Sequence, residues 1–578
     1  MQKRWLIAES IPEVEVNRLS DVLKVDTVVA EVLLQRNVEN FQDAQNFFRP
    51  DLQKLHNPFL MKNMDLAVER LNLAIKQNDI VQLYGDYDVD GTSSVALLYN
   101  YFSKKLTNLT FYIPDRYAEG YGVSQKGMET AVKNGVQLII TLDCGIKNKK
   151  ELDWARTQGI DVIVCDHHEP GEDLPDAIIL NPKQVDCEYP FKELCGCGVG
   201  FKLIQGFHQK NKGDLDEIYG LLDFVAIATG ADIVSVLGEN RILTYHGLKL
   251  LNENTRPNFQ KLLDIAGKKK PLTLTDVVFT LAPRINAAGR INVGSDSVEL
   301  MISSEEAKIQ QFAENINAHN TERRDLDEVI TKEALEMVEE FSLAGGADAR
   351  RTTVVYKDGW SKGVVGIVAS RLIEKHFRPT IVFSENDGML TGSARTVNDF
   401  DIYKSLLACE DLLEKFGGHT HAAGLTLKKE NIQAFQNRFE EIVRANILLE
   451  DLSPTEHVDL AIDFNTIFKS GESLQKLPRL KRVLDQLEPH GPGNMKPVFL
   501  STNVYAVATK VLKEKHLKLS LTQPDCAFSL EAIGFNLADK IDLLAAGLPV
   551  DVLYTLESNV WNDKTTLQLN IKDIRETV

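Results

Sequence analysis

The segment IVQLYGDYDVDGT, residues 80–92, decides the fold, because it joins a short apolar run to a glycine and three aspartates. Two later segments repeat this design, each an apolar run that ends at an aspartate. The three runs are residues 80–84, 136–142 and 160–165. The segments between them, residues 92–103 and 148–157, have helical patterns. Alternating strands and helices predict right-handed βαβ crossovers, and therefore a parallel sheet with helices on both faces.

The rest of the chain divides into regions with different sequence patterns. Residues 64–77 have the spacing of a helix, residues 352–445 again alternate strand and helix patterns, and short β-rich segments follow residue 453. We therefore expect an α/β protein with a small C-terminal barrel or sandwich. The expected parts are an N-terminal helical extension (1–75), an α/β domain (76–300), a connecting helix (301–346), a second α/β domain (347–450) and a β-rich domain (451–578).

The connecting helix has its own start signal. Ser303-Ser304-Glu305-Glu306 has the form of a capping box, and apolar residues then recur at roughly helical spacing until Gly345-Gly346. The pattern predicts either one long helix or two helices that break near residues 317–320.

Composition excludes several classes of protein. The 578 residues are 43% hydrophobic and 26% charged, which is typical of a folded protein and not of a disordered one. No apolar run is long enough to span a membrane, and the stretch Trp5–Ala8 is too short for a signal-peptide core. We therefore expect a cytoplasmic protein with no membrane contact, whose seven cysteines are reduced thiols. A net charge of −18 argues against general coating of duplex nucleic acid, although a local basic groove is compatible with it.

Acidic residues follow every predicted strand of the first α/β domain. Asp86, Asp88 and Asp90 follow the first run, in a segment expected to be extended, so that they lie on one side of it. Asp143 follows the second run, Asp166-His167-His168 the third, and Asp232 a further apolar stretch, residues 221–227. Ligands bind beyond the carboxyl ends of parallel strands, so these side chains are expected to meet.

Simpler explanations exist for each residue alone. A single aspartate after a strand is usually the N-cap of the next helix. The Asp-x-Asp-x-Asp-Gly run also resembles the start of a calcium loop, but Leu97 stands where an EF-hand needs glutamate. Taken together, carboxylates with one or two imidazoles favour Mn²⁺ or Mg²⁺, and so many carboxylates suggest two ions, as in phosphoryl hydrolysis.

These motifs resemble those of the DHH family of phosphoesterases. The matching segments are YGDYDVDG (84–91), TLDCG (141–145), VCDHHEP (164–170) and ATGADIV (228–234), and GGHTHAAG (417–424) resembles the signature of the associated DHHA1 domain. The order of the parts is similar to the RecJ group of single-strand-specific exonucleases. The resemblance implies a DHH catalytic domain, a DHHA1-like substrate domain and a C-terminal OB-like nucleic-acid-binding domain.

The resemblance also implies roles for individual residues. Asp90, Asp143, His167 and Asp232 would hold one ion, with Asp143 as a bridge, and Asp88 and Asp143, with Asp86 nearby, would hold the second. Asp143, Asp166 and His168 are the candidate catalytic residues, with His168 facing the scissile phosphate. Related pyrophosphatases have a histidine at the position of Tyr84, so the second ion is expected to bind more weakly.

Substrate phosphates would bind to residues outside this cluster. The candidates are Arg284, Asn286 and Arg290 in residues 281–290, Ser361 and Lys362 before a predicted helix, Ser393 and Arg395 after a strand, and Gly418 and His419. Arginine suits bidentate phosphate contacts and a helix N-terminus suits anions, although a plain surface pair of arginines is the alternative for residues 284 and 290. Lys510, Lys513, Lys515 and Lys518 are either a basic face for single-stranded DNA or an ordinary solvated face. Cys195-Gly196-Cys197 is expected to be a structural turn.

The sequence thus predicts a metal-dependent 5′-to-3′ exonuclease that hydrolyses single-stranded DNA to 5′-mononucleotides in DNA repair and recombination. The expected cofactors are two Mn²⁺ or Mg²⁺ ions. The expected protein is a monomer, with single-strand-binding protein and a helicase as candidate partners. Two alternatives remain open: a DHH phosphatase or nuclease for short oligonucleotides, and a non-catalytic scaffold that binds DNA ends.

Overall fold

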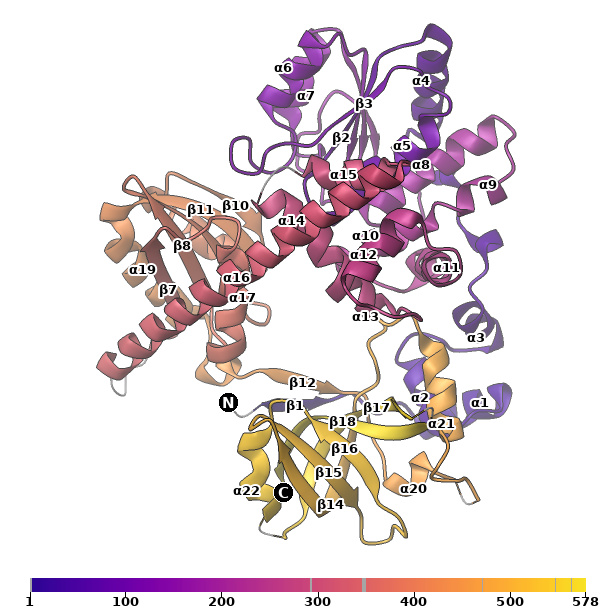
Figure 1. Ribbon diagram of the computed structural model, residues 1–578, viewed down its shortest axis with the longest axis vertical. Helices are drawn as coiled ribbons and strands as arrows, with labels where there is room; N and C mark the ends of the chain where they lie inside the picture. Colours follow the sequence, from indigo (N-terminus) through magenta and orange to yellow (C-terminus); the bar gives the residue numbers. More distant parts are fainter. Residues whose placement is uncertain are drawn as a thin grey trace. The chain divides into compact units, whose positions relative to one another are not determined.

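The computed structural model describes residues 3–291, 294–345, 350–469, 471–545, 547–562 and 564–577 (Figure 1). The chain forms two compact units. The larger unit contains Trp5–Pro283, Ser297–Gln310 and Glu456–Val578, and the smaller unit contains Met1–Arg4, Arg284–Asp296 and Gln311–Thr455. No helix in the described ranges is long and apolar enough to cross a membrane.

The larger unit is built around a five-stranded parallel sheet with the strand order β3-β2-β4-β5-β6. The strands are β2 (Val81–Gly85), β3 (Leu109–Tyr112), β4 (Leu138–Leu142), β5 (Asp161–Cys165) and β6 (Ile178–Leu180). Strands β2 and β4 are buried along their whole length, as expected for strands covered on both faces. The predicted parallel sheet is confirmed.

Helices cover both faces of this sheet (Figure 1). Apolar residues of α6 (Gln125–Lys133) and α7 (Lys149–Thr157) share one core cluster with β4 and β5. The other face carries α5 (Val89–Phe102) and α8 (Gly196–Lys210), which is itself packed against α4 (Met64–Gln77). The remaining helices of this region are α9 (Asp216–Tyr219), α10 (Leu222–Ala231), α11 (Gly238–Glu253), α12 (Pro257–Ile265), α13 (Leu274–Asp276) and α15 (Ser295–Ile302), with a π-helical turn at Val277–Leu281.

The C-terminal part of the larger unit is a closed barrel. Its strands pair in the cycle β14-β15-β16-β18-β17 and back to β14, and β13 adds to the edge of β14. The strands are β13 (Leu460–Ala461), β14 (Phe499–Leu512), β15 (His516–Thr522), β16 (Leu530–Gly534), β17 (Val550–Trp561) and β18 (Lys564–Glu576), with short helices α20 (Phe464–Ile467), α21 (Arg479–Leu484) and α22 (Ile541–Ala545). The β-rich pattern after residue 453 therefore corresponds to a barrel, in which the shortest strand of the cycle, β16, has five residues.

The N-terminal helices belong to the barrel. Apolar residues of α1 (Glu13–Leu23), α2 (Thr27–Leu34) and α3 (Phe41–Phe48) lie in the same core cluster as the barrel strands. The N-terminal strand β1 (Arg4–Ile7) pairs with β12 (Thr455–Val458).

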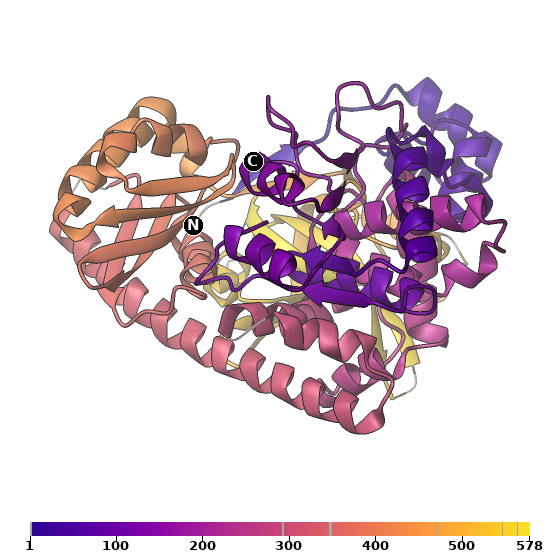
Figure 2. The same cartoon turned by 90° about the horizontal axis from the view of Figure 1, so that it is seen from above.

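The connecting segment is one helix, α16 (Glu306–Gly345), without a break at residues 317–320 (Figure 2). The predicted capping box is wrong. The hydroxyl of Ser303 donates to the carbonyl oxygen of Glu299 and so closes the end of α15.

The smaller unit contains a mixed five-stranded sheet with the order β10-β11-β9-β8-β7, in which only β7 and β8 are parallel. Helices α18 and α19 share a core cluster with one face, and α17 with the end of α16 shares a cluster with the other. The elements are β7 (Thr353–Asp358), β8 (Thr380–Asn386), β9 (Met389–Arg395), β10 (Lys415–His419), β11 (Ala422–Lys428), α14 (Ala282–Ile291), α17 (Val365–His376), α18 (Ile402–Leu407) and α19 (Ile432–Asn446).

The turn from β2 into α5 depends on Gly91. A Cβ atom at this position would lie 2.5 Å from the carbonyl oxygen of Asp86 and 2.6 Å from its amide nitrogen. Gly91→Ala should therefore lower the free energy of unfolding by about 1–3 kcal/mol, although alanine favours helices intrinsically. Urea unfolding measures the change. Gly220→Ala is the control, because no atom lies within 4 Å of its Cβ position, and its effect should stay within about 0.5 kcal/mol. Equal effects of the two substitutions would contradict the prediction.

Candidate active site

The carboxyl ends of three neighbouring strands bring acidic residues to one edge of the sheet. Asp86 follows β2, Asp143 follows β4 and Asp166 follows β5. Each amide still bonds to the adjacent strand: Asp86 N donates to Leu142 O at 3.4 Å, and Asp143 N donates to Cys165 O at 2.9 Å. The side chains therefore leave the sheet at the same level, which confirms the predicted convergence.

Asp88 and Asp90 reach this edge from a helix. The prediction that Asp86, Asp88 and Asp90 line one extended segment is wrong, because α5 begins at Val89. Asp88 caps the helix and accepts from Gly91 N at 3.0 Å. The carboxylate of Asp90 accepts from the amides of Gly196 and Cys197 at 2.6 and 2.7 Å. The N-terminus of α8 thus fixes Asp90 by two hydrogen bonds and a favourable helix dipole.

Asp232 also arrives from a helix. The preceding apolar stretch was expected to be a strand, but it is helix α10, and Asp232 is the C-cap residue. The following residue, Ile233, has a φ of +61°. Such a conformation is unfavourable for a β-branched side chain, and strain of this kind is common beside functional residues.

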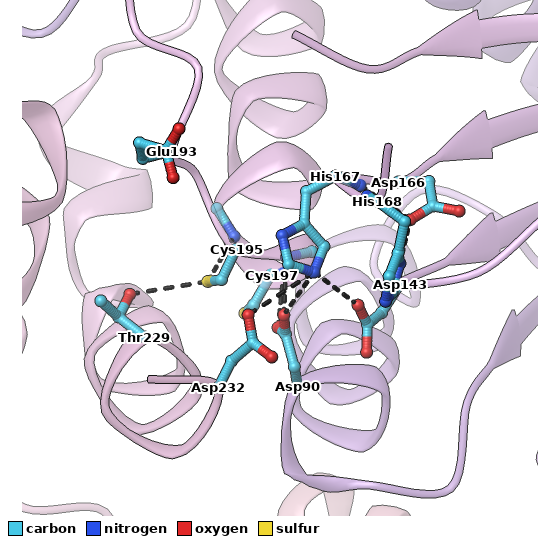
Figure 3. A network of polar contacts seen from close by, with 12 residues as sticks. Asp90, Asp143, Asp166, His167, His168, Glu193, Cys195, Cys197, Thr229 and Asp232 are labelled. Carbon is cyan, nitrogen blue, oxygen red and sulfur yellow. Dashed lines mark hydrogen bonds and ion pairs between the residues drawn. The ribbon is translucent and has the colours of Figure 1, made fainter. Parts of the chain in front are cut away.

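His167 lies at the centre of the group (Figure 3). Its Nε2 atom is 3.2 Å from Asp143 Oδ1, 3.5 Å from Asp232 Oδ2 and 3.9 Å from Asp90 Oδ2. Two sets of potential ligand atoms lie within 4.8 Å of one another: Asp90, His167 and Asp232, and Asp143, His167 and His168.

The donor atoms of this group fit divalent metal ions. Within this group, four buried atoms have no hydrogen-bond partner among the described residues: Asp86 Oδ2, Asp143 Oδ1, His167 Nε2 and Asp232 Oδ2. Buried polar atoms without partners are costly, and here they gather at one place. Carboxylate oxygens with an imidazole nitrogen suit Mn²⁺ or Mg²⁺.

The pKa values of these residues also indicate a site for metal ions. Burial, followed by repulsion from neighbouring aspartates, raises the pKa of Asp90 to about 7 and of Asp232 to about 9, and holds the pKa values of Asp86 and Asp143 well above their ordinary value. Burial and the neighbouring His168 lower the pKa of His167 to about 3, so its ring is neutral and its nitrogen lone pair is available. The carboxylates lack a positive partner that a cation would supply.

Asp166 and His168 form a separate pair. Asp166 Oδ1 accepts from the amides of His167 and His168, and lies 2.7 Å from His168 Nδ1. Burial raises the pKa of Asp166, but the contacts with His168 outweigh it and the pKa lies below its ordinary value. Asp166 also raises the pKa of His168 against the effect of burial. Asp166 therefore orients His168.

Aromatic residues near this pair were missed from the sequence. Tyr121 Oη lies 3.1 Å from His168 Nε2, its ring packs edge-on against Tyr87, and Arg116 lies over the Tyr87 ring. No periodic pattern marked them, since they lie in irregular segments of the chain. Tyr84 is turned away from the ligand atoms, because its hydroxyl donates to Gly122 O and accepts from Ser124 N.

The predicted phosphate-binding residues lie in the smaller unit. A Cβ atom on Gly366, in the first turn of α17, would be 3.0 Å from both Arg395 Nη2 and Ser393 Oγ. Arg290 Nη1 donates to Gly363 O, next to Ser361 and Lys362, which precede the helix. Arg395, Ala422 and His419 align across β9, β11 and β10, as do Ala394, Ala423 and Gly418. The structure thus gathers these residues around one helix start.

Two predicted residues are placed differently. Arg284 Nε donates to Asn317 Oδ1 of α16 at 3.2 Å. Asn286 is half-buried on α14.

Residues 80–229 match the DHH family, N-terminal domain, residues 350–445 match the DHHA1 domain and residues 475–573 match the RecJ OB domain. The single-stranded-DNA-specific exonuclease RecJ of Bacillus subtilis (strain 168) is 36% identical over 574 residues, 99% of this chain and 70% of that protein. The protein of the same name from Salmonella typhimurium (strain LT2) is 34% identical over 89% of this chain and 90% of its own length. The chain belongs to the RecJ family.

Solved RecJ structures share its fold. The crystal structure of RecJ in complex with Mn²⁺ from Thermus thermophilus has a TM-score of 0.84 at 25% identity and covers 100% of this chain and 80% of its own. A RecJ exonuclease bound to manganese has a TM-score of 0.59 at 28% identity over 68% of this chain and 98% of its own. The resemblance and the fold class predicted from the motifs are confirmed, and the C-terminal barrel is the OB fold.

Metal binding should stabilise the folded protein. At a hundredfold excess of Mn²⁺ over its dissociation constant, one site adds about 2.7 kcal/mol, so Tm should rise by several degrees and fall again with chelator. Asp143→Asn should abolish this rise and hydrolysis. Asparagine tolerates the backbone of residue 143, whose φ is +61°, and the metal-free variant should be at least as stable as the wild type because a repelled buried charge is gone.

Thermal unfolding with and without Mn²⁺ measures both effects, and the exposed carboxylate Asp525, replaced in Asp525→Asn, is the control. An Mn²⁺-dependent rise in Tm that survives in Asp143→Asn would show that the bridging assignment is wrong.

Proposed function

We propose that this protein is a metal-dependent exonuclease that hydrolyses single-stranded DNA from the 5′ end to 5′-mononucleotides, in DNA repair and recombination. The observation that carries the proposal is the group of buried, unpartnered ligand atoms on Asp86, Asp143, His167 and Asp232. Membership of the RecJ family supports the substrate, because the relatives are named single-stranded-DNA-specific exonucleases.

The metal ligands divide into two overlapping sets. Asp90, Asp143, His167 and Asp232 would hold one ion, and Asp86, Asp88 and Asp143 the second. The distances from His167 Nε2 to three carboxylates support the first set. The second set has only carboxylates, since Tyr84 is engaged elsewhere, so its ion should bind more weakly. When bound, Mn²⁺ or Mg²⁺ ions supply an activated water and stabilise the leaving 3′ oxygen.

The protein's own residues prepare the reaction. The N-terminus of α8 holds Asp90 in place before metal binds. Asp166 holds His168 through Nδ1 at 2.7 Å, while His168 Nε2 lies 3.1 Å from Tyr121 Oη. His168 would then donate a hydrogen bond to the scissile phosphate, and a positive ring there stabilises developing negative charge.

Different regions of the chain would have different roles in the reaction. Residues 76–300 would carry catalysis, residues 347–450 the phosphate contacts and residues 451–578 the longer DNA strand. Ser361, Lys362, Ser393, Arg395, Gly418 and His419 would bind phosphates near the start of α17, which has no side-chain cap. Arg290 joins them, and Arg284 and Asn286 would contact the strand from α14. The match of residues 475–573 to the RecJ OB domain disfavours a phosphatase for short oligonucleotides.

The cellular location, the oligomeric state and the partners are also part of the proposal. All seven cysteines are free thiols, which supports a reducing, cytoplasmic location. We propose a monomer that acts after strand separation by a helicase and alongside single-strand-binding protein, because the substrate must be unpaired.

Strand discrimination tests the function. With Mn²⁺, a 5′-labelled single strand should release labelled mononucleotide from the first turnover, whereas a 3′-labelled strand should shorten gradually and release its label last. Blunt duplex should be digested at least tenfold more slowly than single strand, since extra unpairing costs a few kcal/mol. Gel analysis of both labels on both substrates measures this. Immediate release of the 3′ label would reverse the polarity, and equal rates on duplex would exclude strand specificity.

Substitution of Arg395 tests the proposed phosphate contacts. A charge-assisted contact contributes about 1.5–3 kcal/mol, so Arg395→Ala should lower kcat/KM by roughly 10- to 150-fold while the Mn²⁺-dependent rise in Tm persists. Arg395→Lys should recover only part of the loss, because charge returns without the planar fork. Lys404→Ala removes an exposed charge of the same unit and is the control. Wild-type rates for Arg395→Ala on strands with a 5′-phosphate or a 5′-hydroxyl would remove this residue from the site.

A further inference from the structure

The buried face of α16 changes character in the middle of the helix. It is apolar at Ala313 and Ile316, and again at Ile330, Ala334 and Val338. Between these positions the same face carries three polar residues: Asn320 and Asp327 are buried, and Arg323 is half-buried. Polar side chains on a packed face are costly unless they are compensated, so this segment does more than pack.

Three arginines gather at this polar segment. Burial and the nearby charges of Arg324 and Arg323 lower the pKa of Arg284, which reaches α16 from α14. Two asparagines one turn apart hold the side chains: Arg284 Nε donates to Asn317 Oδ1 at 3.2 Å, and Arg323 Nη2 donates to Asn320 Oδ1 at 3.0 Å. The guanidinium groups of Arg284 and Arg323 are thus oriented, although their charges and that of the exposed Arg324 repel one another.

The nearest buried carboxylate is already used. Asp327 accepts from Arg371 Nε at 2.8 and 2.9 Å, and Arg371 Nη2 lies 2.7 Å from the same carboxylate. In the described part of the chain, no ion pair joins Arg323 or Arg324 to an acidic side chain. Asp325 and Glu328 are exposed on the same helix, and Asp296 faces His319. Among the described residues, the charges of Arg323 and Arg324 are therefore not matched by an ion pair, and Asp327 is engaged by Arg371.

Two buried nitrogen atoms in this polar segment lack hydrogen-bond partners. Arg323 Nε and His319 Nδ1 are buried and have no hydrogen-bond partner among the described residues. An excess of oriented positive charge with spare donors requires an anion that accepts several hydrogen bonds. Planar guanidinium forks match the oxygens of a phosphate.

We propose that Arg284, Arg323 and Arg324, with His319 beside them, form a binding site for the phosphate backbone of single-stranded DNA. Arg323, Arg324 and His319 belong to no motif identified in the sequence. The inference rests on the proposed function, which supplies the substrate, and adds a backbone contact on the connecting helix. A site with arginines from two helices, Arg284 on α14 and Arg323 and Arg324 on α16, suits a chain of repeating charges better than a single terminal phosphate.

Salt-dependent binding tests the site. Fluorescence anisotropy with a labelled oligothymidylate in chelator, between about 50 and 200 mM NaCl, gives the slope of log affinity against log salt, which becomes shallower by about 0.7 for each phosphate that the protein no longer neutralises. Arg324→Ala and Arg323→Ala should each reduce the slope by about this amount and weaken binding about tenfold at low salt. Arg323→Lys should restore the slope but only part of the affinity, because lysine keeps the charge without the fork.

Arg438→Ala is the matched control, since it removes one exposed arginine of the same unit that is paired with Asp411. Its slope should equal that of the wild type. If Arg324→Ala and Arg323→Ala also keep the wild-type slope while folding normally, the site is refuted even though the exonuclease function stands. A loss of Tm without a change in slope would assign the arginines to helix packing and refute it as well. If the wild-type protein itself does not bind the oligonucleotide, the proposed function and this inference fall together.

Discussion

The structure depends on holding several buried carboxylates of like charge within a few ångströms of one another. Such a cluster opposes folding, because each carboxylate is desolvated and repelled by the others. Backbone hydrogen bonds hold these carboxylates in place. The parallel ladder fixes Asp86 and Asp143 at adjacent strand ends, and the amides of Gly196 and Cys197 clamp Asp90. A Cβ atom on Gly196 would lie 2.6 Å from Asp143 Cβ, so α8 approaches closely only because this residue is glycine.

The position of Asp232 depends on parts of the chain that lie far away in sequence. Residues after Asp232 are braced by the segment before the barrel: Val236 N donates to Pro492 O at 2.8 Å, and Gly491 leaves no room for a side chain beside Val236. Arg241 is buried and donates to the carbonyl oxygens of Phe47, Leu487 and Glu488. The N-terminal helices and the barrel segment therefore support the metal-binding edge through backbone carbonyls.

The features that could be predicted from the sequence are those that depend on interactions between residues close together in the chain. Strands β2, β4 and β5 and helix α4 were found within two residues, because apolar periodicity and the aspartates at strand ends are local signals. The conformation of Asp88 and Asp90 was missed, because α5 starts where α8 supplies hydrogen-bond donors more than a hundred residues later. The helix before Asp232 was missed because α10 is buried all round and shows no amphipathic period. Cys195-Gly196-Cys197 was predicted to be a structural turn, and its contribution to the site is made by the amides of Gly196 and Cys197 and not by the thiols.

Identical residue types acquire different roles here because their surroundings differ. Asp143 and Asp166 follow adjacent strands, but repulsion from other carboxylates adds to the effect of burial at Asp143, whereas amide donors and the His168 ring stabilise the charge of Asp166. The pKa of His167 falls while that of its neighbour His168 rises, because only His168 contacts Asp166 through its ring. A neutral imidazole is a metal ligand and a protonated one is a hydrogen-bond donor. Within the Asp-His-His sequence, the carboxylate of Asp166 therefore orients the second histidine, and the two histidines experience opposite electrostatic surroundings although they are adjacent.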